Sequence, residues 1–249
     1  MSGHSKWSTI KRKKGAADAK RGRIFSRLNK EIMLAARNGG GDPDTNIRLR
    51  NAIAVAKEAN MPKDNITRAV KKGAGELDDG SIIEEINYEG YGPGGIAVIV
   101  ETITDNRNRT TADVRHAFAK FGGNLGETGC VGWMFARKGL ITFLKTAVKQ
   151  DQLEEVAIEN GADDIKEDAE TVDVTCAIED FEKLKKAFED AKFKWEEAEI
   201  SNIPQSTVKV EGRQAESVIR LIEALDELDD VQHVSANFDI SEADLQAME

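Results

Sequence analysis

The chain has 249 residues, of which 40% are hydrophobic and 32% are charged, and its formal net charge is −10. This length fits one large domain or two to three small ones. Apolar runs such as residues 96–100 are far shorter than the roughly 20 residues of a membrane span, and the basic N-terminus lacks the apolar segment of a signal peptide. Two cysteines, Cys130 and Cys176, cannot form a disulfide framework, which favours the cytoplasm. The composition excludes membrane-spanning proteins and small disulfide-rich secreted proteins.

Charge is distributed unevenly along the chain. Residues 1–72 hold 18 Lys and Arg against 6 Asp and Glu, a net charge of +12, whereas residues 73–249 hold 17 against 39, a net charge of −22. Such asymmetry is typical of proteins that bind nucleic acid or an acidic surface. An alternative stays open, in which the basic segment docks on the acidic remainder of the same chain.

The N-terminal segment combines a basic tail with an amphipathic helix. Residues 1–14 show no apolar periodicity, which favours a tail that is disordered or folds on binding; Trp7 in it fits either stacking on a base or anchoring the tail. Residues 15–38 carry apolar side chains at three- and four-residue spacing, beginning at Ile24, which predicts a helix with one apolar face. Ten cations lie in the tail or on the opposite helix face: Lys6, Lys11, Arg12, Lys13, Lys14, Lys20, Arg23, Arg27, Lys30 and Arg37. We expect these cations to contact the phosphates of a nucleic acid.

Two further helices complete a predicted three-helix bundle. Glycines at 39–41 end the first helix. Asp42-Pro43 predicts the start of the second helix, with Asp as the N-cap, and this helix runs to Asn60. Pro62 opens a third, short helix that ends at Gly73.

Near residue 80 the hydrophobic period changes from 3.6 to 2, which indicates strands. Residues 82–89 and 96–104 predict a hairpin, because a glycine-rich loop joins them. A helix over 110–121, capped by Thr110 or Thr111, and a strand over 124–136 follow.

The next segment has a self-contained pattern. Its expected order is strand, helix, strand, strand, helix and strand, over 140–144, 152–160, 164–168, 172–178, 181–191 and 195–203. This order is ferredoxin-like, and Asp151 with Glu154 predicts the cap of its first helix. A strand at 207–210, a helix at 213–228 and a strand at 231–238 close the chain.

The sequence therefore predicts an α+β fold with three domains. The first, residues 1–79, holds the basic tail and the helical bundle. The second is a discontinuous α+β domain made of 80–137 and 204–249, and the third is a ferredoxin-like domain inserted at 138–203. The pattern itself leaves two consecutive domains open as an alternative.

No catalytic, metal-binding or cofactor-binding motif stands out. The Gly-x-Gly-x-x-Gly pattern at 90–95 matches a dinucleotide fingerprint, but a strand follows it instead of a helix, so we expect a hairpin loop. His4, His116 and His233 lie far from one another and from either cysteine in sequence, which provides no metal-site spacing. We expect His233 at the surface. We expect neither an enzyme nor a resident cofactor or metal.

The polar loop at 104–111, Thr-Asp-Asn-Arg-Asn-Arg-Thr-Thr, is a second candidate binding feature. A helix N-terminus favours anions, and Arg107 and Arg109 beside it would add charge-assisted hydrogen bonds to a phosphate. A capping threonine accounts for one residue of the loop, but not for two arginines and two asparagines. We expect an anion contact here.

Five motifs together resemble the YebC/PmpR family. They are Met-Ser-Gly-His-Ser-Lys-Trp at 1–7, Gly-Gly-Gly-Asp-Pro at 39–43, Asn-Met-Pro-Lys-Asp-Asn-Ile at 60–66, Tyr-Glu-Gly-Tyr-Gly-Pro-Gly-Gly at 88–95 and Thr-Asp-Asn-Arg-Asn-Arg-Thr at 104–110. The resemblance covers essentially the whole chain. It implies a cytoplasmic three-domain α+β protein with an N-terminal helical bundle and a ferredoxin-like domain inserted in the second domain. It favours the insertion over consecutive domains and implies no catalytic residues.

The resemblance implies two functions of different classes. Members are generally described as probable transcriptional regulators that bind DNA, and some, including mitochondrial relatives, as translational activators at the ribosome. Our first hypothesis is a DNA-binding transcriptional regulator. The second is a translation factor that contacts rRNA or tRNA through the basic N-terminal domain. In both, residues 150–200, with a net charge of −12, repel nucleic acid and suit a protein partner, and no membrane partner is expected.

Overall fold

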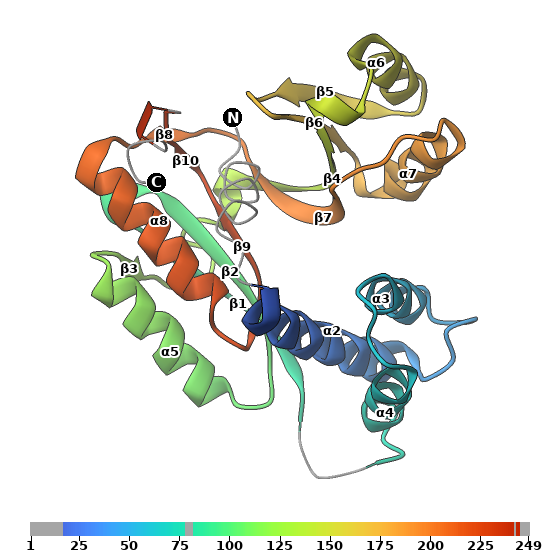
Figure 1. Cartoon of the computed structure of the whole chain (residues 1–249). Helices are drawn as coiled ribbons and strands as arrows, with labels where there is room; N and C mark the ends of the chain where they lie inside the picture. The colour runs from blue at the N-terminus through green and yellow to red at the C-terminus, as the bar shows by residue number, and fades with distance from the viewer. Residues whose placement is uncertain (1–16, 78–81, 242, 245–249) are drawn as a thin grey trace.

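The computed structural model describes residues 17–77, 82–241 and 243–244. These residues form a helical bundle and two four-stranded sheets, each covered by two helices (Figure 1). The mixed α+β fold expected from the sequence is confirmed.

The bundle consists of α2 (Ala17–Gly39), α3 (Ile47–Glu58) and α4 (Lys63–Gly73). Residues 32–36 of α2 are all buried, because α3 and α4 pack on one side and Ile103 of the first sheet packs on another. The predicted apolar face of α2 is therefore buried toward the C-terminal end of the helix. Ile24, expected on the same face, is instead 38% exposed.

The second helix begins later than the sequence predicts. It starts at Ile47, with Asn46 as the N-cap in place of Asp42. The Asn46 side chain accepts a hydrogen bond from Leu49 N at 3.0 Å and donates to Ala35 O and Gly40 O, each at 2.8 Å. Because Asn46 reaches back to the end of α2, it fixes where α3 begins, and residues 42–45 form a turn.

The first sheet contains β1 (Glu84–Tyr91), β2 (Ala97–Thr104), β3 (Asn124–Leu125) and β9 (Val231–Ala236). Its order is β3-β1-β2-β9 and all neighbours are antiparallel, so the predicted β1–β2 hairpin is confirmed. The helices α5 (Arg107–Lys120) and α8 (Gly212–Asp226) lie side by side on one face of this sheet (Figure 1). A core that includes Val100, Phe118 and Leu221 is fully buried between the helices and the sheet. Two short strands, β8 (Val208–Lys209) and β10 (Phe238–Asp239), pair in parallel nearby.

The strand predicted over 124–136 is wrong in its middle. After Leu125 the chain leaves the sheet and returns to extended structure only at Phe135, through a 3-10 turn at Gly132–Met134. The reason is the carboxylate of Glu89, which accepts hydrogen bonds from Gly129 N at 2.8 Å, Val131 N at 2.8 Å and Gly132 N at 2.7 Å. Burial alone would raise the pKa of Glu89, but these three backbone donors outweigh it and lower the pKa. The charged side chain of Glu89 on β1 therefore stabilises a loop where the sequence pattern predicts a strand.

The second sheet contains β4 (Phe135–Leu144), β5 (Ala162–Glu167), β6 (Thr171–Cys176) and β7 (Glu197–Pro204). Its antiparallel order β5-β6-β4-β7, with α6 (Gln150–Glu159) and α7 (Phe181–Asp190) between the strands in sequence, is the ferredoxin-like arrangement. Rings of Phe143, Phe188 and Phe193 meet edge to face in its core.

Two details of this sheet differ from the sequence analysis. The N-cap of α6 is Lys149, without a side-chain hydrogen bond, and Asp151 lies in the first turn. β4 also runs without a break through the expected domain boundary at 137/138, because it pairs with β7 from Phe135 onward. The domain boundaries drawn from the sequence stay predictions.

Candidate nucleic-acid interface

Half of the ten N-terminal cations predicted to contact phosphates fall outside the described residues. These are Lys6, Lys11, Arg12, Lys13 and Lys14. Lys20 lies within α2, at a position whose side chain is not described. Contacts between these six residues and a nucleic acid stay predictions.

Three of the other cations on α2 form ion pairs with the last residue of α8 or with the connection from α8 to β9. The pairs are Arg23 Nη1 with Glu227 Oε1 at 3.2 Å, Arg27 Nη1 with Asp226 Oδ1 at 3.1 Å, and Lys30 Nζ with Asp230 Oδ1 at 2.6 Å. This helix face is therefore not free in the folded chain, and the alternative of intramolecular docking applies to these three residues. Their use as phosphate contacts stays a prediction that requires the pairs to open. Arg37 is also engaged, because its Nη1 donates to Ile83 O at 3.1 Å.

Asp230 lies at the centre of this contact, with a side chain only 6% exposed. It accepts hydrogen bonds from Lys30 Nζ at 2.6 Å, Arg109 Nη2 at 2.8 Å and Thr110 Oγ1 at 2.7 Å, with Thr104 Oγ1 at 3.2 Å. We call these five residues the Asp230 cluster. Burial alone would raise the pKa of Asp230, but the hydrogen bonds from Lys30, Thr110 and Arg109 lower it to about 2. The cluster holds the bundle against the first sheet and its helix α5.

The loop with Arg107 and Arg109 is shorter than predicted. Asn106 is the N-cap of α5, and its side chain accepts from Arg109 N at 3.1 Å, so both arginines belong to the first helical turn. Neither Thr110 nor Thr111 caps the helix. Arg109 is not free for an anion, because its Nη2 also lies 3.0 Å from Asp105 Oδ1. The expected anion contact is left to Arg107.

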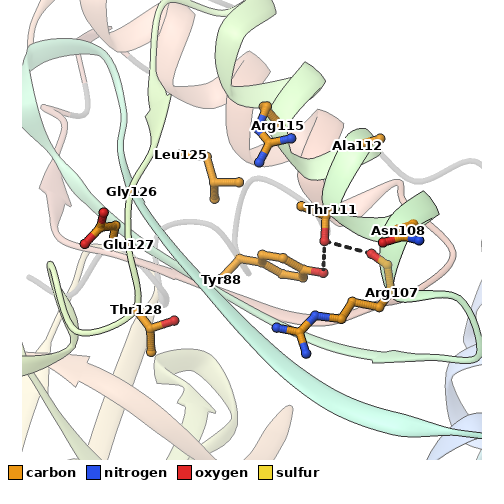
Figure 2. A pocket seen from close by; sticks show the side chains of 10 residues that line it. All are labelled: Tyr88, Arg107, Asn108, Thr111, Ala112, Arg115, Leu125, Gly126, Glu127 and Thr128. Atoms are coloured by element: carbon orange, nitrogen blue, oxygen red, sulfur yellow. Dashed lines mark hydrogen bonds between the residues drawn. The ribbon is translucent and has the colours of Figure 1, made fainter.

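Arg107 lines an open pocket of roughly 580 Å³ between α5 and the loop after β3 (Figure 2). Arg115, two turns further along α5, lines the same pocket. Both arginines are exposed, and neither forms an ion pair within the described part of the chain. Arg115 is not among the residues predicted from the sequence, although the spacing 107, 111, 115 places all three residues on one helix face.

A second group of cations was also missed. Arg50 and Lys57 on α3, and Lys63, Arg68 and Lys71 on α4, are exposed and have no ion pair with any described residue. We call them the α3–α4 cations. Their signal was present in the sequence, because they lie off the faces that bury Leu49 and Ile66. Their neighbour Arg48 differs, because it pairs with Glu31 at 2.7 Å and Glu85 at 3.2 Å.

Other candidate chemistry is sparse in the residues described here. They contain no group of three or more His, Cys, Asp or Glu side chains that could hold a metal ion, and none of their helices is long and apolar enough to span a bilayer. His233 has a side chain 43% exposed, in line with its expected surface position, and its Nδ1 lies 3.3 Å from Glu199 Oε2. Desolvation would lower the pKa of His233, but the neighbouring carboxylates of Glu199 and Glu101 outweigh it and raise the pKa above its ordinary value.

Two family models match this chain. Residues 5–76 match the TACO1/YebC protein N-terminal domain, and residues 83–238 match the TACO1/YebC second and third domain. The chain belongs to the TACO1/YebC family. The resemblance carried by the sequence motifs is thereby confirmed.

Individual YebC relatives match over nearly their full length. A protein of Geotalea uraniireducens is 57% identical over 248 residues, with 100% of each chain covered, and one of Syntrophobacter fumaroxidans is 56% identical over 241 residues, with 96% of each covered. Both are named probable transcriptional regulatory protein. The crystal structure of a conserved hypothetical protein from Aquifex aeolicus is 50% identical and superposes with a TM-score of 0.83, covering 90% of this chain and 93% of the other.

Proposed function

We propose that this protein is a nucleic-acid-binding regulator of gene expression, and specifically a DNA-binding transcriptional regulator. The names of its relatives support regulation of transcription. The observation that carries the binding is the set of α3–α4 cations, which are exposed and have no carboxylate partner among the described residues. In this proposal the protein acts in the cytoplasm, and its acidic segment at residues 150–200 binds a protein partner.

Free cations are better phosphate ligands than paired ones. Each cation that neutralises a phosphate releases condensed counterions, which drives binding. For Arg23, Arg27 and Lys30 that gain is offset by the loss of an existing ion pair, whereas the α3–α4 cations have no such pair with any residue that the structure describes. Backbone contacts of this kind favour binding with little sequence readout.

The test compares two variants of the full-length chain with equal changes in charge. The first variant changes the α3–α4 cations to Gln. The control changes to Gln five exposed lysines in or beside the helices that cover the second sheet: Lys149, Lys183, Lys186, Lys192 and Lys194. Binding to a labelled duplex is measured by fluorescence anisotropy over a range of salt concentrations. For every phosphate that a variant no longer neutralises, the slope of log K against log salt should flatten by about 0.9.

We expect the α3–α4 variant to bind with lower affinity and a flatter slope, and the control variant to match the wild type. Equal affinity and slope for all three proteins would contradict the proposed interface. Crosslinking in cells followed by sequencing then identifies the nucleic acid. Recovery of promoter DNA supports the proposal, and recovery of rRNA or tRNA would replace it with a translation factor.

A further inference from the structure

The pocket beside α5 has features that the α3–α4 cations do not explain. It lies on the first sheet, outside the bundle, and combines two arginines with an apolar floor of Tyr88 and Leu125. Arg107 and Arg115 are eight residues apart on α5, which separates their backbone positions by about 12 Å. Figure 2 shows their guanidinium groups on opposite sides of the Tyr88 ring. The pocket therefore has the Tyr88 ring and Leu125 between two guanidinium groups.

Hydrogen bonds hold the lining in place without using either guanidinium group. Thr111 Oγ1 lies 2.8 Å from the Tyr88 hydroxyl and 2.7 Å from Arg107 O, to which it donates (Figure 2). The opposite wall, residues 126–128, enters the loop that the Glu89 carboxylate fixes through backbone N–H groups. A pocket with a preset shape loses little conformational entropy when a ligand binds.

The charges of the lining are unbalanced. Glu127 is the acidic residue of the lining, and it forms no ion pair with Arg107 or Arg115 within the described residues. Guanidinium groups bind phosphate oxygens through paired, charge-assisted hydrogen bonds. Two such groups on either side of an aromatic ring and an aliphatic side chain suit a ligand that has phosphates on either side of a flat ring.

We propose that this pocket binds one unstacked nucleotide of a single-stranded nucleic acid. Arg107 and Arg115 contact the phosphates on its two sides, and the base lies against Leu125 and the small exposed part of Tyr88, which is 8% exposed. The inference rests on the proposed function, because the partner is of the same class, but it assigns different residues. The pocket would also discriminate between single strands and duplexes, whereas the α3–α4 cations would bind the phosphates of either.

A single strand fits this site better than a duplex. In a duplex each base is stacked and paired, and it reaches a pocket only after it is flipped out at a cost in stacking and pairing. Single strands present unstacked bases to apolar and aromatic side chains without that cost. The roughly 580 Å³ of the pocket lies within the range of small-molecule sites.

The experiment uses the full-length chain and three labelled probes: single-stranded RNA and DNA of about ten nucleotides, and a duplex of about 20 base pairs. One variant, Arg107→Ala with Arg115→Ala, removes both charges. A second, Ala112→Phe, fills the pocket from α5 without a change of charge. The matched control, Arg137→Ala with Arg213→Ala, removes two exposed arginines that form no ion pair with a described residue. Circular dichroism melts verify that all variants are folded.

We expect the double arginine variant to weaken single-strand binding by about tenfold or more, because it removes two charge-assisted contacts. Ala112→Phe should also weaken single-strand binding while duplex binding stays within about twofold, since it blocks the base and leaves the charges. The control should bind every probe like the wild type. Whichever single strand, RNA or DNA, shows the larger decrease in affinity is the natural partner.

Two results would overturn the proposal that this pocket binds a nucleotide while leaving the proposed function intact. One is single-strand binding by both pocket variants at the wild-type level. The other is an equal decrease in affinity for single strands and for the duplex in the double arginine variant, together with unchanged binding by Ala112→Phe. The arginines would then act only through nonspecific electrostatic attraction. A wild-type chain that binds none of the probes would overturn both proposals.

Discussion

At the scale of single residues, Asp230 is the most deeply buried of the three carboxylates that pair with Arg23, Arg27 and Lys30. It is nearly buried and receives hydrogen bonds from Lys30, Arg109 and Thr110. Its folded pKa of about 2 lies below the ordinary value of 3.8, so the ionised form stabilises the fold above about pH 4. That stabilisation is lost as the pH falls through 2, and linkage sets it at about 2 kcal/mol.

We therefore predict that Asp230→Asn lowers the free energy of unfolding at pH 7 by about 2 kcal/mol, because Lys30 and Arg109 lose their carboxylate. Urea denaturation between pH 2 and 7 measures it, and the difference from wild type should shrink toward pH 2. The control is Asp229→Asn, because Asp229 is exposed and contributes its backbone oxygen to Lys30. Equal decreases in stability in the two variants would contradict the role given to Asp230.

At the scale of elements, α2 is a helix with two different partners. Its C-terminal half packs in the bundle, while Arg23, Arg27 and Lys30 dock it on the α8–β9 connection. A triple charge reversal at these arginine and lysine positions therefore disturbs the contact between α2 and the α8–β9 region as well as any nucleic-acid contact. Such a variant does not isolate binding, which is why the α3–α4 cations make the cleaner test.

The docking itself is testable with a double-mutant cycle on Arg27 and Asp226, whose charged groups are 3.1 Å apart. Arg27→Glu should lower stability because it places two carboxylates together, and adding Asp226→Arg should restore part of that stability. A coupling energy of about 1 kcal/mol or more, measured by urea denaturation, is expected for a direct contact. Additive effects of the two changes would show that the helix face does not dock there.

How far the sequence predicts each element depends on the range of the contacts that decide it. The periodicity of α2 and the alternation of β6 are local, so both elements are placed within a few residues. The start of α3 depends on Asn46 reaching Ala35 and Gly40, and the loop after β3 depends on Glu89, about 40 residues away. Sequence patterns in a short window carry neither contact.

The candidate site depends even more on contacts between residues that are far apart in sequence. The charge asymmetry predicts a basic surface, but the partners of Arg27 and Lys30 lie about 200 residues away along the chain. The helix spacing that would have selected Arg68 or Arg115 is local, whereas the absence of a nearby carboxylate is a tertiary property. The pocket beside α5 likewise needs β1, α5 and the loop after β3 together.

At the scale of the whole molecule, the fold divides its cations between internal and external use. Arg23, Arg27 and Lys30 bind the acidic part of the chain, whereas the α3–α4 cations and the two pocket arginines have no ion pair with any described residue. The tail lies outside the described residues, and its contact with nucleic acid stays a prediction. We predict that removal of residues 1–14 weakens nucleic-acid binding and flattens the salt dependence by up to about 4.5 for a duplex, since five cations are removed. The melting temperature should change by no more than about 2 °C, because the sequence of this segment shows no apolar periodicity.

This deletion becomes decisive when it is combined with the Gln variant of the α3–α4 cations. If the tail and the two helices contact different phosphates, the two reductions in salt slope add, because independent sites have additive effects. If the tail competes with the helices for the same phosphates, the combined reduction is smaller than the sum. A tail-deleted chain with wild-type affinity and slope on both duplex and single strands would show that the tail does not contact the nucleic acid at all, and binding would then have to come from the α3–α4 cations and the pocket beside α5.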